Sequence, residues 1–185
     1  AERDGSVVFT TKNGLTIGLY GMVYYKLDVE DMTAEIAALR EAGCDLVIVA
    51  PHWGAEGSYH PTQEQVDVGH AAIDAGADIV WGSHPHVLQP IEAYNGGMIY
   101  YSLGNFVFGG NLYPKDLDSA LLQQEIIRDE TGVHLGELRI VPVSVSSIEK
   151  RNNFQPTPWE PGTEEYDRVL SKLEGSFTGP NLTIG

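Results

Sequence analysis

The amino-acid sequence predicts a layered α/β fold in which helices flank a largely parallel β core. Two successive segments, AGCDLV (42–47) and AGADIV (75–80), share one order of features: a helix end, a glycine that stops the helix and a buried strand. Each segment leads to a histidine, His52 in the first and His84 in the second. Apolar strands that alternate with helices are typical of a parallel sheet covered on both faces. Beyond residue 90, strand-like runs dominate instead.

The first predicted element is a β-hairpin. Strand-like runs at 7–11 and 15–20 flank Lys12, Asn13 and Gly14. Asn-Gly between two strands favours a tight turn in which both central residues take a positive φ. We therefore expect an antiparallel strand pair at the start of the chain.

A helix is predicted over residues 29–42. Met32, Ile36 and Leu39 recur at spacings of four and three, so they share one helical face. Gly43 follows as the expected stop, because glycine readily takes the left-handed conformation that ends a helix. The lone cysteine, Cys44, comes next and is interpreted as a small core residue rather than a nucleophile.

A second helix is predicted between Thr62 and Gly76. Thr62 and Gln65 have the spacing of a capping box, in which each residue satisfies a backbone N–H of the other. Strands are expected after the two helices and further along the chain, at 45–50, 79–81, 91–94, 98–102, 121–128 and 133–145. A proline-rich tail with a helix over 163–173 completes the chain. We predict one domain, 1–185, with 152–185 as a C-terminal extension.

The charge balance limits the classes of partner. With 11 basic and 26 acidic residues, the chain has a net charge of −15. Such a chain repels phosphate backbones and anionic lipids, so we predict no nucleic-acid partner. The acidity either maintains solubility alone or accompanies a cationic ligand or metal. No apolar run reaches the roughly 18–20 residues of a membrane span, and the first residues resemble sequence from the middle of a protein.

Three histidines form the strongest candidate site. Pro85 disfavours the α conformation at His84, and extended residues at i and i+2 face the same side, so His84 and His86 are expected to converge. Gly82 would let the backbone approach closely. Two histidines in a loop are ordinary, but His52 at the equivalent strand end adds a third imidazole at the same sheet edge.

Imidazoles together with carboxylates suit Zn²⁺, Mn²⁺ or Fe, and the residue types do not choose among these metals. Two such ions about 3.5–4 Å apart can clamp the attacking and leaving oxygens of a hydrolysis. Glu56 is a candidate general acid or base, a ligand contact or a solvated carboxylate. Asn105 either lines the pocket or stabilises a turn. We assign no ligand role to the other histidines, His60, His70 and His134.

Four motifs resemble the CapA family, the PGA-cap domain, over residues 5–145: HWGAE (52–56), PTQEQ (61–65), GADIVWGSHPHVLQPIE (76–92) and YSLGNFVF (101–108). The resemblance implies a role in bacterial capsule or poly-γ-glutamate synthesis and a fold like that of calcineurin-like metallophosphatases, with two divalent metal ions. It places metal ligands at His52, His84 and His86. We further predict catalytic roles for Glu56 and His84, and substrate contact by Asn105.

The family pattern also has an earlier aspartate-bearing strand and Asn-His turn, which this sequence lacks. We therefore expect an incomplete domain with an exposed apolar sheet edge, able to pair with the missing half, another copy or other capsule-synthesis subunits. One functional hypothesis is a metal-dependent hydrolase that acts on a phosphoester or polyanionic polymer. The other is a non-catalytic component of a polymer synthesis or export complex. By resemblance alone, the location is the extracellular face of the membrane.

Overall fold

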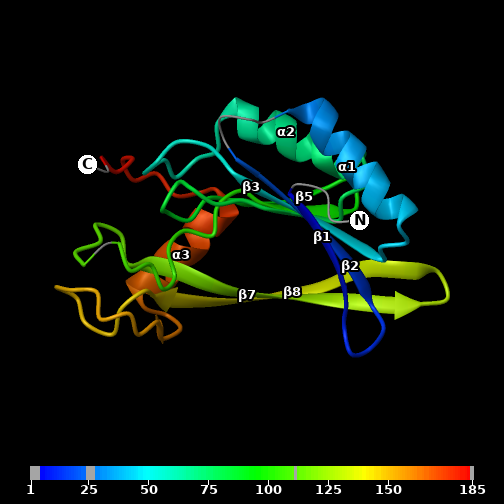
Figure 1. Ribbon diagram of the computed structural model, residues 1–185. Helices are drawn as coiled ribbons and strands as arrows, with labels where there is room; N and C mark the ends of the chain where they lie inside the picture. Colours follow the sequence, from blue (N-terminus) through cyan, green and yellow to red (C-terminus); the bar gives the residue numbers. More distant parts are fainter. Residues whose placement is uncertain (1–4, 24–27, 111, 184–185) are drawn as a thin grey trace.

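The computed structural model describes residues 5–23, 28–110 and 112–183, which form two β-sheets and three helices (Figure 1). The first residues were interpreted above as sequence from the middle of a protein, and residues 1–4 lie outside the described ranges. Helices α1 and α2 cover one face of the larger sheet, and the long β7–β8 pair runs along its other side (Figure 1). The layered α/β fold is therefore confirmed.

The larger sheet has six strands in the order β1-β2-β3-β4-β6-β5. Its strands are β1 (Ser6–Thr10), β2 (Thr16–Val23), β3 (Leu46–His52), β4 (Ile79–Trp81), β5 (Ile91–Tyr94) and β6 (Gly97–Tyr100). The inner strands β2, β3, β4 and β6 are parallel, whereas β1 and β5 are antiparallel edge strands. The predicted parallel core is thus present, and its strands end at one common edge.

The second sheet has three antiparallel strands in the order β7-β8-β9. Its strands are β7 (Asp118–Asp129), β8 (Gly132–Ser144) and β9 (Thr157–Pro158). Helix α3 (Glu164–Glu174) packs against this sheet. Strand β9 was not predicted. Helix α3 buries Val169 and Leu173 against Leu88 and Ala120, so the predicted C-terminal extension contributes a second hydrophobic core.

Helix α1 (Val29–Glu41) packs on the larger sheet as its periodicity predicts. Met32, Ile36 and Leu39 are all buried. Gly43 has a φ of 82°, the left-handed conformation expected just beyond the helix end. Cys44 is buried in the same core, which confirms its interpretation as a packing residue.

Helix α2 (Gln63–Asp74) begins with the predicted capping box between Thr62 and Gln65. Gln65 is also buried, and its amide donates a hydrogen bond of 2.8 Å to Gln89 Oε1. A Cβ on Gly54 would lie 2.4 Å from Gln65 Oε1, so the loop after β3 packs tightly against the start of this helix. The helix thereby fixes the loop that carries Glu56.

The first hairpin forms, but its turn differs from the prediction. Of the Asn13-Gly14 pair only Gly14 has a positive φ (80°). The Thr11 N–H donates to the Leu15 carbonyl (2.8 Å) and the Gly14 N–H to the Thr11 carbonyl (2.9 Å). This is a three-residue loop that needs one left-handed residue, not two. The predicted conformation occurs between β5 and β6, where both central turn residues have a positive φ.

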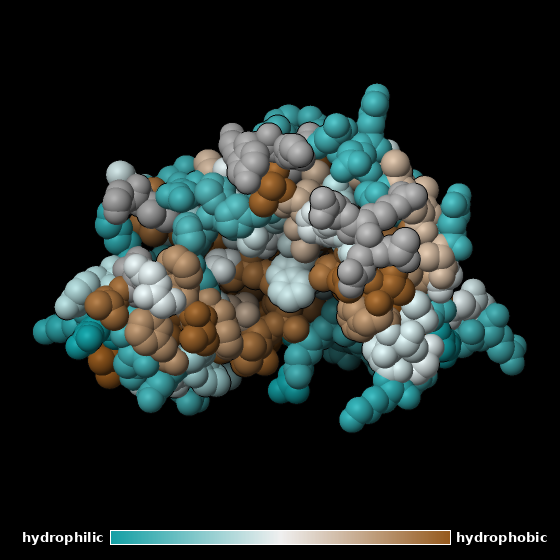
Figure 2. All heavy atoms as spheres, in the orientation of Figure 1, coloured by the Kyte–Doolittle hydropathy of each residue, from teal (hydrophilic) through white to brown (hydrophobic). Residues whose placement is uncertain are grey.

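Apolar side chains are exposed at the edge of the larger sheet, as predicted. Val7, Val8 and Phe9 of edge strand β1 are 45–47% exposed. Trp81, at the end of β4, is 51% exposed. Apolar side chains also gather in a hollow in the middle of one face of the molecule (Figure 2). Within residues 5–23, 28–110 and 112–183, no helix has both the length and the apolar character of a membrane span.

Candidate functional site

His52 and His84 lie at the carboxyl ends of neighbouring parallel strands. His52 is the last residue of β3. It forms an isolated parallel β-bridge with Ser83, the residue directly before His84. The ring centroids of His52 and His84 are 4.6 Å apart, and those of His84 and His86 are 6.2 Å apart. The predicted gathering of three imidazoles at one sheet edge is therefore confirmed, while their role as ligands stays a prediction.

The backbone that brings His84 and His86 together is not the extended one predicted. His84 has a φ of 103° and His86 a φ of 60°. Pro85 does keep His84 out of the α region, but the chain turns sharply between β4 and the segment that follows. Positive φ at non-glycine residues is strained by about 1–3 kcal/mol each, and such strain clusters at functional sites.

Gly82 permits this turn, as its position in the sequence suggested. A Cβ on Gly82 would lie 2.1 Å from the Tyr101 carbonyl oxygen and 2.5 Å from Trp53 Nε1. The fully buried Trp53 indole donates a 2.8 Å hydrogen bond to the same carbonyl. Trp53 is thus a packing residue, and it holds the backbone just after β6 close to the turn that follows β4.

Ser83 holds the ring of His52 through its Nδ1. The Ser83 hydroxyl oxygen lies 3.1 Å from His52 Nδ1 and 3.4 Å from the Pro51 carbonyl oxygen. A partner at Nδ1 leaves Nε2 as the ring nitrogen that is available to a metal. Partial burial of the ring lowers the pKa of His52, and the nearby His84 and His86 lower it further, against a smaller opposing effect of Glu56. The neutral, ligand-competent form is therefore favoured.

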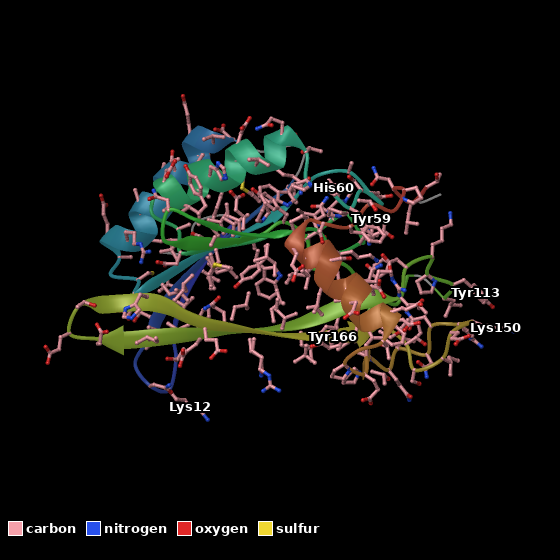
Figure 3. All side chains as sticks on the ribbon, turned by 180° about the vertical axis from the view of Figure 1, so that it is seen from behind. Lys12, Tyr59, His60, Tyr113, Lys150 and Tyr166 are labelled. Carbon is pink, nitrogen blue, oxygen red and sulfur yellow. The ribbon has the colours of Figure 1, made fainter. Side chains whose placement is uncertain are left out.

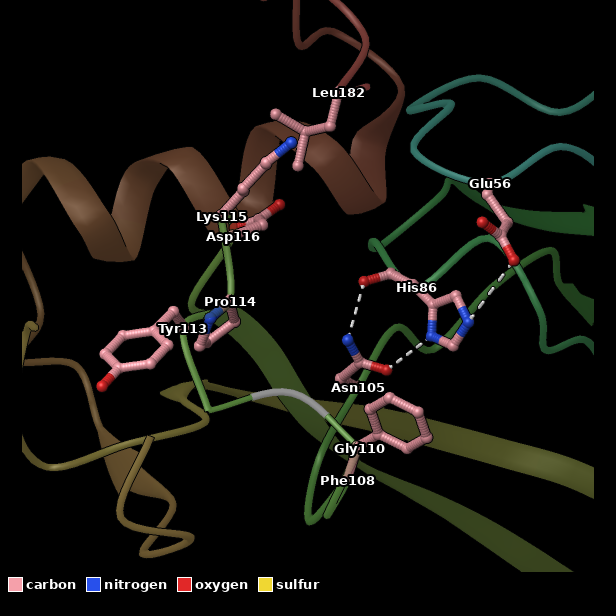
Figure 4. A pocket seen from close by; sticks show the side chains of 10 residues that line it. All are labelled: Glu56, His86, Asn105, Phe108, Gly110, Tyr113, Pro114, Lys115, Asp116 and Leu182. Carbon is pink, nitrogen blue, oxygen red and sulfur yellow. Dashed lines mark hydrogen bonds and ion pairs between the residues drawn. The ribbon is translucent and has the colours of Figure 1, made fainter. Parts of the chain in front are cut away.

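Asn105 fixes the tautomer of His86. Its amide nitrogen donates to the His86 carbonyl oxygen (3.3 Å), so its amide oxygen faces His86 Nδ1 at 2.9 Å and accepts from it (Figure 4). The Nε2 of His86 faces the Glu56 carboxylate, with 3.9 Å between Nε2 and Oε1. Asn105 thus orients a candidate ligand, and it also lines the pocket beside it.

A pocket of about 320 Å³ adjoins His86. Two parts of its wall come from the loops after β3 and β4, and the rest comes from residues that follow β6 and from the C-terminal tail. The lining residues are Glu56, His86, Asn105, Phe108, Gly110, Tyr113, Pro114, Lys115, Asp116 and Leu182 (Figure 4). Both polar and apolar side chains line it, so the pocket suits a ligand with both kinds of surface.

The donors fit a divalent transition metal in kind, since imidazole nitrogens suit Zn, Mn and Fe. The arrangement of these donors, however, is not a complete metal site. Within the part of the chain that the structure describes, no group of three or more His, Cys, Asp or Glu side chains could hold a metal ion. Glu56, with 46% of its side chain exposed, does not complete such a group. The described residues therefore supply candidate ligands without enclosing an ion by themselves.

The other three histidines have different surroundings, and their lack of a ligand role stays a prediction. His70 lies 3.0 Å from a carboxylate oxygen of Glu92 and stacks on Tyr94 at a centroid distance of 3.7 Å, which is a structural role. His60 and His134 are exposed. Sequence reasoning missed the orienting role of Ser83, although it directly precedes His84. It also missed the pocket residues after Phe108, for which no local pattern gives a signal.

We predict that His84 depresses the pKa of His52. In a His84→Gly variant, the His52 pKa should rise toward its ordinary value of 6.5 but remain below it, because partial burial persists. Glycine tolerates the φ of 103° at this position, so the backbone need not change. NMR titration of the imidazole protons measures this shift. A His134→Asn variant should leave the His52 pKa unchanged, and an unaltered pKa in His84→Gly would contradict the assigned coupling.

Comparison with known proteins identifies the family. The sequence model of the family described as bacterial capsule synthesis protein PGA_cap matches residues 3–110. The PGA biosynthesis protein CapA of Bacillus subtilis is 42% identical over an alignment of 113 residues, which covers 58% of this chain and 30% of that protein. The capsule biosynthesis protein CapA of Bacillus anthracis is 42% identical over 106 residues, 57% of this chain and 25% of that protein. The chain thus spans less than a third of the length of these two relatives.

Among solved structures, the sulfate thiohydrolase SoxB of Thermus thermophilus, determined with glycerol, aligns with a TM-score of 0.52. The alignment covers 90% of this chain and 28% of that one, at 15% sequence identity, so it supports the fold alone. That fold is metallophosphatase-like, as the four motifs implied. Because the family model matches more than half of its 185 residues, the chain belongs to the bacterial capsule synthesis protein PGA_cap family.

Proposed function

We propose that this chain forms part of a metal-dependent, phosphoesterase-like hydrolase that acts in bacterial capsule or poly-γ-glutamate biosynthesis. One observation carries the proposal: His52, His84 and His86 lie together at the strand ends, where Ser83 contacts Nδ1 of His52 and Asn105 accepts a hydrogen bond from Nδ1 of His86. In metal sites, the ring nitrogen that does not bind the metal usually makes a hydrogen bond that orients the imidazole. A cluster of histidines with only a packing role does not require such hydrogen bonds.

In this proposal, His52, His84 and His86 hold divalent ions, and residues outside this chain supply further ligands. When bound, such ions polarise an ester and activate water. The Glu56 carboxylate faces the pocket near His86 and can take up or return a proton there. His84, between the other two rings, serves as a ligand and assists proton transfer. Asn105 holds His86 in place and contacts the substrate.

The substrate class that we propose is a phosphoester or a polyanionic polymer. The two Bacillus relatives are named for capsule and PGA biosynthesis, which supports a polymer of the cell envelope. We extend this to a location at the extracellular face of the cell membrane. Partners would be other capsule-synthesis subunits, the remainder of the metallophosphatase-like domain or a second copy that pairs along the apolar edge of β1.

Metal removal from the full-length protein tests the proposal. Turnover of a chromogenic phosphate ester is expected to disappear after dialysis against a chelator and to return on addition of Mn²⁺, Zn²⁺ or Fe²⁺. Elemental analysis before and after dialysis confirms that the metal has left. Turnover that persists in metal-free protein would exclude a metal-dependent hydrolase.

A second candidate is a non-catalytic component of a polymer synthesis or export complex. The observation that favours it is the lack of a three-ligand group among residues 5–23, 28–110 and 112–183. This candidate expects His84→Gly and His86→Gly strains to form capsule normally. Loss of capsule, with protein levels and thermal unfolding unchanged, would favour the enzyme instead.

A further inference from the structure

The pocket beside His86 is built from two parts of the chain. Glu56, His86 and Asn105 belong to the segment that matches the family model, residues 3–110. Lys115 and Leu182 form the opposite wall and lie outside that segment (Figure 4). One wall therefore carries candidate chemistry inside the segment that matches the family model, and the other wall lies outside that segment.

The second wall is anchored to the core through Asp116. Its carboxylate accepts hydrogen bonds from the Tyr59 hydroxyl (2.8 Å) and from Lys172 Nζ (2.7 Å). Lys172 is 2% exposed, and it also contacts the buried carboxylate of Asp118 at 2.7 Å. These contacts fix the backbone of the neighbouring Lys115, so its side chain starts from a defined position at the pocket.

The C-terminal tail closes the same wall. The Leu182 N–H donates to the Gly57 carbonyl oxygen (2.9 Å), and the Asn181 side chain accepts from the Tyr59 N–H (3.1 Å). A Cβ on Gly57 would lie 2.1 Å from the Leu182 carbonyl oxygen, and the φ of Gly57 is 73°. The tail is therefore seated directly on the loop that carries Glu56, beside the pocket.

The charges on this wall are unequal. Asp116 is neutralised by the buried Lys172, whereas the Lys115 ammonium donates to the carbonyl oxygen of Thr183. No carboxylate pairs with Lys115 within the described ranges. An ammonium group has three donors, so the contact with Thr183 leaves capacity for a ligand. In a chain of net charge −15, the described residues thus leave the Lys115 ammonium without a paired carboxylate, opposite Glu56 and His86 in the pocket.

We infer that Lys115 is the specificity-determining residue of this pocket and binds an oxyanion of the substrate, either a carboxylate or a phosphate. The substrate is an extended anion: its reacting group lies at the histidines while a second anionic group reaches Lys115. Phe108, whose ring is 5.2 Å from that of His86, and Leu182 contact the apolar part between the two groups. The position of the reacting end rests on the proposed function, but anion binding by Lys115 does not.

Calorimetric titration of the full-length protein tests this inference with three probes: a γ-glutamyl tripeptide, phenyl phosphate and the tripeptide with its carboxylates converted to amides. Lys115→Met should weaken binding of an anionic probe about 10-fold or more, because a charge-assisted hydrogen bond is lost. Lys115→Arg should retain most of the affinity. The amide probe should bind all three proteins equally. Whichever anionic probe loses more affinity identifies the source of the oxyanion.

Lys12→Met is the matched control, since Lys12 is an exposed lysine in the first hairpin, at the opposite end of the molecule from Tyr113 (Figure 3). It should bind every probe as the wild type does. Equal affinity of Lys115→Met and wild type for both anionic probes would overturn the inference. Lys115 is exposed, so its replacement leaves the fold intact, and a thermal melt checks this.

The same titration in chelator-treated protein separates the two proposals. If turnover proves independent of metal while the Lys115 effect persists, the proposed function fails and the anion site stands. If turnover depends on metal while Lys115→Met binds normally, the anion site fails and the proposed function stands.

Discussion

Replacing His84 with glycine in the full-length protein is expected to lower metal-dependent ester hydrolysis by at least about 100-fold. Loss of a residue that merely orients a metal ligand already costs about 10–100-fold in metal affinity or activity. His84 lies between the other two rings, 4.6 Å from His52 and 6.2 Å from His86 by ring centroids, so its loss removes the middle of the candidate ligand set. Steady-state kinetics and metal content, measured together, check the expectation.

Glycine is the informative replacement because alanine at a φ of 103° would add backbone strain to the loss of the ring. His134→Ala is the matched control, since this exposed histidine of β8 has no part in the site. It should retain wild-type turnover and metal content. A His84→Gly protein that keeps both its metal and its rate would show that the histidine cluster is not the reaction centre.

Local signals were sufficient to predict much of the larger sheet. The order helix, glycine, apolar strand and histidine occurs twice, and parallel neighbours end at the same edge, so the meeting of His52 and His84 followed from topology alone. The capping box at Thr62 was also predicted, because its two residues are three apart in sequence. Features of this kind depend on neighbours within one helix turn or one strand.

Features that depend on distant partners could not be predicted. The tail contact between Asn181 and Tyr59 joins residues 122 positions apart, and nothing in either segment indicates the other. The positive φ of His84 escaped prediction because the Pro85 rule excludes the α region without choosing among the remaining conformations. Asn105 was left open between a turn and a pocket role. The structure shows that it orients His86, a relation that requires two loops to meet in space.

The burial of Lys172 is the least predictable of these features. It also leads us to expect a large loss of stability when Lys172 is replaced. Lysine on an amphipathic helix is ordinarily exposed, yet Lys172 of α3 is 2% exposed. Its ammonium lies 2.7 Å from both Asp116 and Asp118 and 4.6 Å from the ring centroid of Tyr59. Asp118 is itself fully buried and also binds Arg168. The charges therefore satisfy one another away from water.

Lys172→Met is expected to destabilise the protein by about 3–5 kcal/mol, because it leaves two carboxylates near the core with less compensating charge. Urea unfolding monitored by tryptophan fluorescence measures the loss as a shift in midpoint at constant slope. Lys150→Met, at an exposed position, should change the free energy of unfolding by no more than about 0.5 kcal/mol. A Lys172→Met midpoint equal to that of the wild type would contradict the assigned network.

The double variant Lys172→Met, Asp116→Asn decides whether charge or packing is responsible. Neutralising Asp116 removes one uncompensated carboxylate, so the double variant should be more stable than the sum of the two single changes predicts. Strictly additive losses would indicate that Lys172 acts through the packing of its aliphatic chain instead. Because Asp116 also anchors the pocket wall beside Lys115, a real coupling would mean that helix α3 holds the proposed anion site in place, although it lies outside the segment that the family model matches.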